Sequence, residues 1–388
     1  MLGRTSRNHR SYRHQYDIDG MVGISSTIRL PELEFFRTHT VDAPDIIIRT
    51  RPVGGLTPRA NVSVRGNAQR IEYREHLGAL FANFAIDMDD PVTVSAGPLL
   101  ALSPHVLYTN VVEPLLRFVL VSKGKMLLHA ACISVGGKPV MLSAKTDTGK
   151  TSTILTMLRS DGGVFYSDDM VIIDEAGVAS RYPKPLTISA HTLRAVPQHR
   201  LKPRQKLTLS WQSRLHSREG RSVGKKLGAA NLPIMSMNAV VQAIIPPPKY
   251  HVTELVSCVI GSRVRMQNLF VIERGTPAFT ESIAHATAVD ELLENTEDAY
   301  GFPPYSSLAP YITIRGQRHT HLKEREREIL QTALSTVDVQ RIRVPDYSWP
   351  AVIMSGTAGR VAAAVQEAEA EVPLVSAPEW AGAASSAS

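Results

Sequence analysis

The chain has 388 residues, of which 43% are hydrophobic and 20% charged, and its formal net charge is +7. This length allows two domains or one large domain with extensions, and the composition is ordinary for a globular protein rather than a fibrous or low-complexity one. Two cysteines, Cys132 and Cys258, exclude a disulfide framework and favour buried thiols in strands and a reducing, cytoplasmic location.

The first 105 residues fall into two predicted segments. Residues 1–20 are polar and basic, so we predict them to be disordered, and no apolar core of secretory-signal length follows them. From residue 21 to 105, short β-like runs such as DIIIRTRPVG alternate with turn signals, which predicts a small α+β domain. No run of about 18 apolar residues occurs in the sequence, so no segment is expected to span a membrane.

The next segment opens a predicted nucleotide-binding domain, which extends over residues 106–350. SPHVLYTNVVEPLLRFVLVSKG (103–124) has apolar residues at helical spacing and ends at a glycine. MLLHAACISV (126–135) and KPVMLSA (138–144) are apolar runs of strand length on either side of two glycines. This pattern predicts a tight β-hairpin.

Further elements are predicted beyond the hairpin. STILTMLR (152–159) has the composition of a helix, and FYSDD (165–169) with MVIIDEAGVA (170–179) predicts a strand pair. The sequence HLKEREREILQTALS (321–335) predicts a helix with alternating charges on its outer face, which we interpret as solvent-facing scaffold. Residues 351–388 are rich in Ala, Ser and Glu and are predicted to be mostly disordered.

A phosphate-binding loop is predicted between the hairpin and the helix that follows it. Backbone N–H groups of such a loop and of the helix N-terminus converge on phosphate oxygens, and a glycine before the lysine lets the backbone come close. The lysine reaches the β and γ phosphates, and the following hydroxyl ligates Mg²⁺. An aspartate stands where a glycine is common, a residue that tolerates left-handed backbone angles. The predicted nucleotide-binding residues are Ala144, Lys145, Thr146, Asp147, Thr148, Gly149, Lys150, Thr151 and Ser152.

Three more residues are predicted to form a catalytic site with Lys150. Asp168 and Asp169 end an apolar strand, where one acid would hold Mg²⁺ and a second would accept the proton of a substrate hydroxyl. Adjacent strand residues point to opposite faces, so both serve one site only if the strand ends there. The alternative is that one of them forms a turn. His129 lies in the strand entering the hairpin and is either a core histidine or part of the site.

The span from LLHAACISV to FYSDDMVIID resembles the catalytic core of the HPr kinase/phosphorylase family, which is related to phosphoenolpyruvate carboxykinase. The family has a His-Gly pair in the first strand, a glycine-rich GKS or GKT loop after the second, and an Asp-Asp pair after the helix. In this chain Ala130 follows His129, and the loop lacks two of the family's usual glycines. The matching residues, in type, order and approximate spacing, are His129, Lys150, Thr151, Asp168 and Asp169. The resemblance implies an α/β (mixed α+β) fold with a P-loop core of this kind, and ATP and Mg²⁺ as cofactors.

The activity implied by the resemblance is transfer of phosphate to a hydroxyl. One aspartate would be the base, the other would contact Mg²⁺, and His129 would tune the base. We assign Mg²⁺ to Thr151 and Asp169 and leave open which aspartate is the base. Ser152 stands where bacterial HPr kinases have Glu, and their LEIRGLG-type signature is missing, so the expected acceptor is a small molecule or peptide rather than HPr. A nucleotide-binding regulatory module without transfer chemistry is the alternative.

Two basic features are candidates for contacting an anionic acceptor. Lys184 stands between two prolines that fix the backbone around it, and it either contacts substrate or lies in a surface turn. Between Arg194 and Lys226 there are ten Lys or Arg and one acid, which favours an anionic partner or a solvated basic loop. A single aromatic in this stretch gives no strong nucleic-acid signal. The resemblance also raises a homo-oligomer as a possible assembly.

Overall fold

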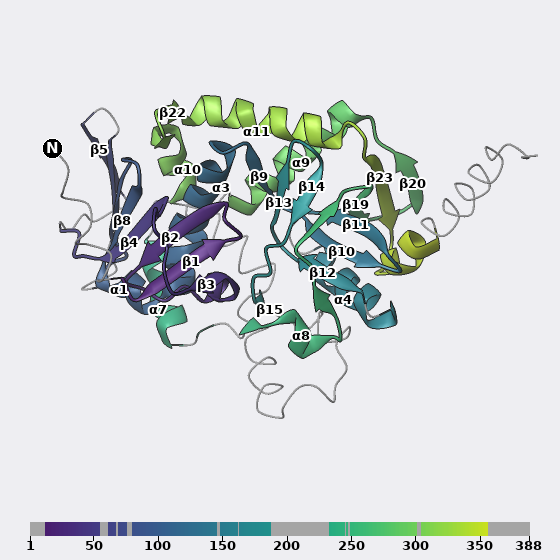
Figure 1. Ribbon diagram of the computed structural model, residues 1–388, viewed down its shortest axis with the longest axis horizontal. Helices are drawn as coiled ribbons and strands as arrows, with labels where there is room; N and C mark the ends of the chain where they lie inside the picture. Colours follow the sequence, from purple (N-terminus) through teal and green to yellow (C-terminus); the bar gives the residue numbers. More distant parts are fainter. Residues whose placement is uncertain are drawn as a thin grey trace, which may run out of the picture. The chain divides into compact units, whose positions relative to one another are not determined.

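The computed structural model describes residues 12–54, 61–66, 69–75, 80–145, 148–161, 163–187, 233–244, 246, 249–300 and 304–355 (Figure 1). The protein is of the mixed α/β class, as expected. The chain divides into two compact units, Met1–Tyr347 and Ser348–Ser388. The boundary predicted at residue 105 therefore does not separate compact units. In the second unit, residues 349–355 are helical, so the disorder predicted from residue 351 does not apply to 351–355.

The N-terminal part of the chain forms an eight-stranded sheet. Its strand order is β3-β1-β2-β4-β8-β7-β6-β5, with β4 parallel to both β2 and β8. A 3₁₀ helix, η2 (Pro31–Phe36), precedes β3. The strands are β1 (His14–Ile18), β2 (Val22–Ser26), β3 (Arg37–Thr38), β4 (Ile46–Thr50), β5 (Asn61–Arg65), β6 (Arg70–Arg74), β7 (Phe84–Asp87) and β8 (Val92–Ala96).

The disorder predicted for residues 1–20 is wrong for residues 14–18, which form β1. Tyr16 and Ile18 alternate along this strand and are fully buried in the core. The turn to β2 is made by Asp19 and Gly20, which have positive φ angles of 48° and 72°. The burial of two large apolar side chains outweighs the polar character of the surrounding sequence.

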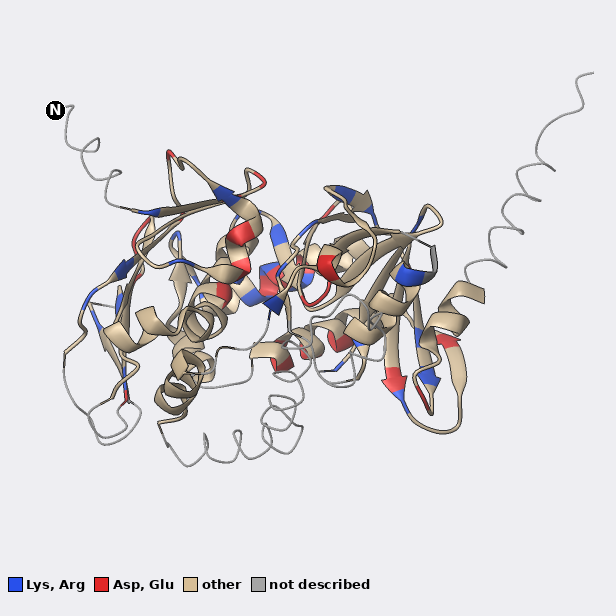
Figure 2. Cartoon of the chain, turned by 90° about the horizontal axis from the view of Figure 1, so that it is seen from below, with Lys and Arg blue, Asp and Glu red and all other residues tan. Residues whose placement is uncertain are grey.

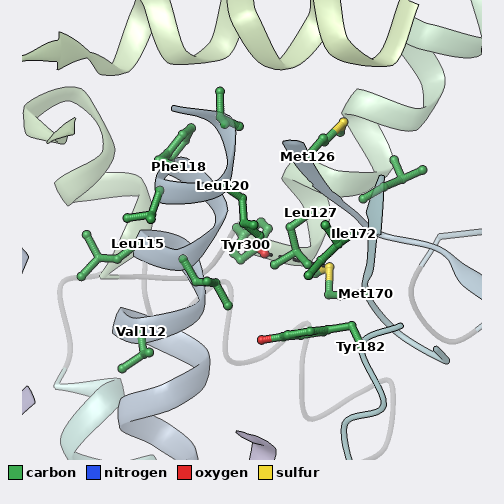
Figure 3. Close-up of a cluster of buried hydrophobic side chains, with 14 of the residues drawn as sticks. Val112, Leu115, Phe118, Leu120, Met126, Leu127, Met170, Ile172, Tyr182 and Tyr300 are labelled. Carbon is green, nitrogen blue, oxygen red and sulfur yellow. Dashed lines mark hydrogen bonds between the residues drawn. The ribbon is translucent and has the colours of Figure 1, made fainter. Parts of the chain in front are cut away.

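The predicted helix over 103–124 is present but segmented. It comprises α2 (Pro104–Leu107), a π-helical turn, η3 (Tyr108–Val112), and α3 (Glu113–Val121), and α1 (Pro98–Leu102) precedes it. Gly124, with φ of 72°, follows the end of α3. Every residue of α3 is buried, so this helix packs on all sides. Figure 3 shows Leu120 of this helix beside Tyr300 and Leu127, which come from other elements of the same core.

A seven-stranded sheet carries the predicted hairpin. The strand order is β17-β12-β10-β11-β19-β23-β20, in which β11, β19 and β23 are parallel. The hairpin between β10 and β11 turns at Gly136 and Gly137, both at positive φ, as the sequence predicts. The strands are β10 (Ala131–Val135), β11 (Lys138–Ser143), β12 (Val164–Ser167), β17 (Val259–Ile260), β19 (Asn268–Arg274), β20 (Phe279–Ser282) and β23 (Asp338–Val344).

A smaller four-stranded sheet lies next to it, in the order β18-β14-β13-β9. Its strands are β9 (Lys125–Leu128), β13 (Val171–Asp174), β14 (Val178–Ser180) and β18 (Arg263–Arg265). The run 126–135, predicted as one strand, is divided between β9 in this sheet and β10 in the larger one. Likewise β12 and β13 belong to different sheets and do not pair with each other, contrary to the prediction.

Both divided segments change sheet at the same place, which we call the seam. β9 pairs with β13 and β10 pairs with β12, so the two chain segments run side by side through both sheets. The residues that cross the seam are His129 and Ala130 on one segment, and Asp168 to Met170 on the other. The seam therefore brings the predicted histidine next to the predicted aspartates.

The helices α9 (His285–Tyr300) and α11 (His319–Leu334) pack against each other, and α11 also contacts α3, β9 and β13. Between them lie α10 (Tyr305–Leu308), η6 (Ala309–Tyr311), β21 (Thr313–Ile314) and β22 (Gln317–Arg318). The prediction that the charged helix only faces solvent is wrong for one side of α11. Glu326 on that side is fully buried and pairs with the fully buried Arg117, at 2.6 Å between Oε1 and Nε.

A two-stranded antiparallel sheet pairs β15 (Leu186–Thr187) with β16 (Lys249–Tyr250), and a long insertion connects these two strands. The short helix α8 (Val252–Leu255) follows β16. Within it, α7 (Ile234–Ile244) packs against α1 and α2, so the N-terminal region contains a distant part of the chain. The basic stretch 194–226 lies outside the described residues.

Two further expectations concern cysteines and membranes. Cys132 is buried in β10 as predicted, whereas Cys258 is half-buried and precedes β17. Among the described residues, no helix combines the length and the apolar character needed to cross a bilayer. Figure 2 shows basic and acidic positions interspersed over the described elements in that view.

Candidate active site

The predicted phosphate loop connects β11 to α4 (Lys150–Asp161), as expected from the sequence. Ala144 is buried at the end of the strand and Lys145 is exposed. Thr148 turns the chain back, because its N–H and its Oγ1 both donate to the Lys145 carbonyl, at 3.2 and 2.7 Å. Gly149 has a positive φ of 126°, a backbone angle that residues with a side chain adopt only with strain. Thr146 and Asp147 lie outside the described residues.

The helix α4 begins with three of the predicted residues. Lys150, Thr151 and Ser152 form its first turn, where backbone N–H groups have no partner within the helix. These donors and the positive end of the helix dipole make this turn suited to an anion. The Lys150 side chain is 9% exposed and its Nζ lies 3.4 Å from the carbonyl oxygen of Asp169.

Thr151 connects the loop to the first aspartate. Its Oγ1 donates a hydrogen bond to Asp168 Oδ2 at 2.9 Å. The other oxygen, Asp168 Oδ1, is buried and has no hydrogen-bond partner among the described residues. Burial raises the pKa of Asp168 to about 6, and the nearby positive charge of Lys150 only partly opposes this. The Thr151 hydroxyl therefore contacts Asp168. The sequence-based assignment had instead paired Thr151 with Asp169 as the metal ligands.

Asp169 has different partners from Asp168. Its Oδ2 accepts a hydrogen bond from Lys184 Nζ at 2.7 Å, and its Oδ1 lies 3.5 Å from His129 Nε2. The side chain is 49% exposed, so it can be reached from solvent. Burial favours a higher pKa, but the positive charges of Lys184 and Lys150 hold the pKa of Asp169 far below its usual value. Both aspartates follow the end of β12, which meets the condition for two acids at one site.

His129 is held on three sides by the surrounding chain. Its Nδ1 lies 3.1 Å from the carbonyl oxygen of Asn295, and its backbone N–H donates to Thr296 Oγ1 at 3.3 Å. Ser143 Oγ donates to the His129 carbonyl at 3.2 Å. The contact with a carbonyl places the ring proton on Nδ1, which leaves the lone pair of Nε2 facing Asp169. Burial, reinforced by Lys150, lowers the pKa of His129 to about 4, so the ring is neutral at pH 7.

Lys184 is the predicted substrate residue, and its cation is fixed inside the protein. Its side chain is 13% exposed and its Nζ also donates to Glu113 Oε1 at 2.6 Å. Burial disfavours the charge on Lys184, yet the two carboxylates raise its pKa above the usual value. Lys184 therefore lies beside the catalytic candidates and positions Asp169.

Several residues at the site were not found from the sequence. Glu113 is buried, burial raises its pKa, and Tyr108 donates to it at 3.1 Å. Tyr108 in turn shares a short hydrogen bond with Tyr182. The signal for Glu113 was present, because an acid inside the apolar run NVVEPLLRFVLV is unusual unless it is paired.

A cavity of about 440 Å³ opens beside the phosphate loop. It lies between the loop, the end of β19 and one side of α9 (the elements are seen in Figure 1). Its lining includes Lys145, Thr148, Arg274, Thr276, Glu291 and Asn295.

The residues at the loop fit a bound Mg²⁺. Mg²⁺ is held in proteins by one or two carboxylates together with substrate phosphates and waters, and Asp168 Oδ1 is a buried carboxylate oxygen that lacks a partner among the described residues. The Thr151 hydroxyl beside it is a second oxygen donor. No cluster of three or more His, Cys, Asp or Glu side chains suited to a metal occurs in the described part of the chain.

Comparisons with known proteins leave the site to be interpreted from its own geometry. No family model matches the chain, and a search of curated proteins found no match.

Proposed function

We propose that the protein is an Mg²⁺- and ATP-dependent phosphotransferase that acts on a hydroxyl acceptor. The observation that carries the proposal is the contact between Thr151 and Asp168 at the start of α4, beside the buried Lys150. In phosphate-loop enzymes these three residue types hold the metal and the terminal phosphates. The resemblance to HPr kinases rests on the same residues.

The chain's own residues have separate roles in this proposal. The backbone N–H groups of the first turn of α4 and the Lys150 ammonium bind phosphate oxygens. Asp168 and Thr151 hold Mg²⁺, which neutralises phosphate charge when bound. This replaces the sequence-based assignment of the metal to Asp169, because the Thr151 hydroxyl lies on Asp168.

Asp169 is the proposed base. The acceptor hydroxyl transfers its proton to Asp169 Oδ1 while its oxygen forms a bond to the terminal phosphorus. The bond from that phosphorus to the bridging oxygen breaks, and ADP leaves. His129 Nε2 and Asp169 Oδ1 are two acceptors 3.5 Å apart, so a proton arriving on the carboxylate is stabilised by the imidazole lone pair. Lys184 keeps Asp169 ionised before transfer.

Binding calorimetry of ATP and ADP, with and without Mg²⁺, tests the nucleotide part of the proposal. We expect Mg²⁺-dependent binding that Lys150→Met abolishes. Lys125→Met is the matched control, since Lys125 lies in β9 with Asp174 at 3.7 Å as its ion-pair partner. Absence of binding to the wild type at millimolar ATP would refute the proposal.

The transfer step needs its own measurement. We expect Asp169→Asn to bind Mg²⁺-ATP normally while losing phosphate release to water or to added hydroxyl compounds. Wild-type binding without turnover over a broad acceptor screen would favour the alternative, a regulatory nucleotide-binding module.

A cytoplasmic location stays a prediction.

A further inference from the structure

The cavity beside the phosphate loop shares residues with the loop itself. Lys145 and Thr148 line it, and both belong to the loop that precedes Lys150 at the start of α4. Its volume of about 440 Å³ is within the range of small-molecule sites, which is about 300–1,000 Å³. A ligand in this cavity would be continuous with phosphates at the start of α4.

Three of the four charged side chains that line the cavity have ion-pair partners outside the lining, and for Lys145 the partner is Glu294 at 3.9 Å. Two of its carboxylates are neutralised from outside the lining: Glu291 pairs with Arg341 at 2.7 Å, and Glu273 pairs with Arg343 at 2.6 Å. Arg274 has no carboxylate within ion-pair distance among the described residues, and its Nη1 donates to a tyrosine hydroxyl at 2.7 Å. The guanidinium also lies over the ring of the same tyrosine, Tyr347, with its carbon 5.2 Å from the ring centroid.

Asn295 supplies a buried acceptor on the cavity lining. The residue is 2% exposed, and its Oδ1 is buried without a hydrogen-bond partner among the described residues. Its Nδ2 donates to Ser143 Oγ at 3.4 Å, which fixes the orientation of the amide. A buried acceptor without a donor is unfavourable, so a ligand that brings an O–H or N–H group is the partner that the site lacks.

We propose that this cavity binds the nucleoside part of the nucleotide, with a ribose hydroxyl or a base amino group donating to Asn295 Oδ1. The inference rests on the proposed function, because it places the nucleoside next to the phosphates of the same ligand. Asn295 then has two roles, since its backbone carbonyl also holds the Nδ1 proton of His129. Nucleoside binding and the orientation of the imidazole depend on one residue.

The test compares Mg²⁺-ATP with Mg²⁺-tripolyphosphate, which has the phosphates and no nucleoside. We expect the wild type to bind ATP more tightly. Asn295→Ala should weaken ATP binding about tenfold and leave tripolyphosphate unchanged, which corresponds to one lost hydrogen bond. Asn295→Asp keeps Oδ1 and should retain much of the preference. Asn110→Ala is the matched control, because Asn110 donates to Val106 in the helical layer.

The outcomes separate this inference from the proposed function. Equal affinity of the wild type for ATP and tripolyphosphate, or equal weakening of both by Asn295→Ala, overturns the nucleoside site alone. Failure of both ligands to bind overturns the proposed function and this inference with it. If thermal melting shows that Asn295→Ala is unfolded, the exposed Arg274 provides the second variant. Arg274→Ala should lower ATP affinity selectively, and an unchanged ATP-to-tripolyphosphate ratio would refute the inference.

Discussion

Replacing Lys184 by methionine should destabilise the protein through Glu113 rather than through Asp169. Lys184 Nζ bridges the two carboxylates, at 2.6 Å from Glu113 and 2.7 Å from Asp169. Asp169 is half exposed, so water can solvate it when the cation is removed. The Glu113 side chain is only 5% exposed and would remain as an unpaired buried charge. Breaking a buried pair in this way costs about 3–5 kcal/mol.

Urea unfolding of three variants measures this cost. Lys184→Met should lose about 3–5 kcal/mol. Lys125→Met, which breaks a pair with both side chains about a quarter exposed, should lose no more than about 1 kcal/mol. The double variant Lys184→Met/Glu113→Gln should recover most of the loss, because no buried charge remains and the amide oxygen still accepts from Tyr108. The reasoning is refuted if the double variant is no more stable than Lys184→Met.

The change of stability with pH provides a second test of the Lys184→Met prediction. Burial raises the pKa of Glu113 above its usual 4.5, and removing Lys184 raises that pKa further. The folded variant then binds a proton that the unfolded chain has lost, so its stability falls as pH rises above about 4.5. The gap between wild type and Lys184→Met should therefore be widest at neutral pH and narrow toward pH 4.5. A gap that widens on acidification would contradict this account.

Three other outcomes follow from buried groups. Arg117→Leu should cost about 3–5 kcal/mol in urea unfolding, and adding Glu326→Leu should restore most of it, since both side chains are fully buried; equal loss in the double variant would argue against a charge penalty. Gly163→Ala should cost about 1–3 kcal/mol, because a Cβ would lie 2.2 Å from a carbonyl oxygen, whereas Gly54→Ala meets nothing within 4 Å and should be neutral. A thiol reagent should label one cysteine per native chain and two in denaturant, because Cys132 is buried and burial raises its pKa to about 12.

The local parts of the site could be predicted from the sequence. The hairpin, the loop and the helix after it are set by neighbouring residues, above all by glycines at positive φ. The end of the strand before Asp168 was also a condition stated from the spacing of side chains alone. These features depend on contacts within a short stretch of chain, which sequence patterns describe well.

The remainder depends on partners that are far apart in sequence. The run through His129 is apolar on both sides of this histidine, so its pattern does not show that its two halves belong to different sheets. The bond from Lys184 to Glu113 joins residues 71 positions apart. The burial of Glu326 is decided by Arg117, which lies on another helix 209 positions away. Charge alternation along α11 predicted exposure because this pairing is invisible from the helix alone.

The seam also bears on the order of folding. The chain leaves it at His129, forms the hairpin, the loop and α4, and returns to it at Asp169, whose Oδ1 lies 3.5 Å from His129 Nε2. Within this excursion β10 pairs with β11, which follows it across a two-glycine turn, and with β12, and pairs between nearby segments form rapidly because little loop entropy is lost. The groups that fix Lys184 and His129 come from farther along the chain, since Glu113 is 71 positions from Lys184 and Asn295 is 166 positions from His129. We therefore expect the phosphate-binding part to gain structure before the contacts that hold Lys184 and His129 beside Asp169.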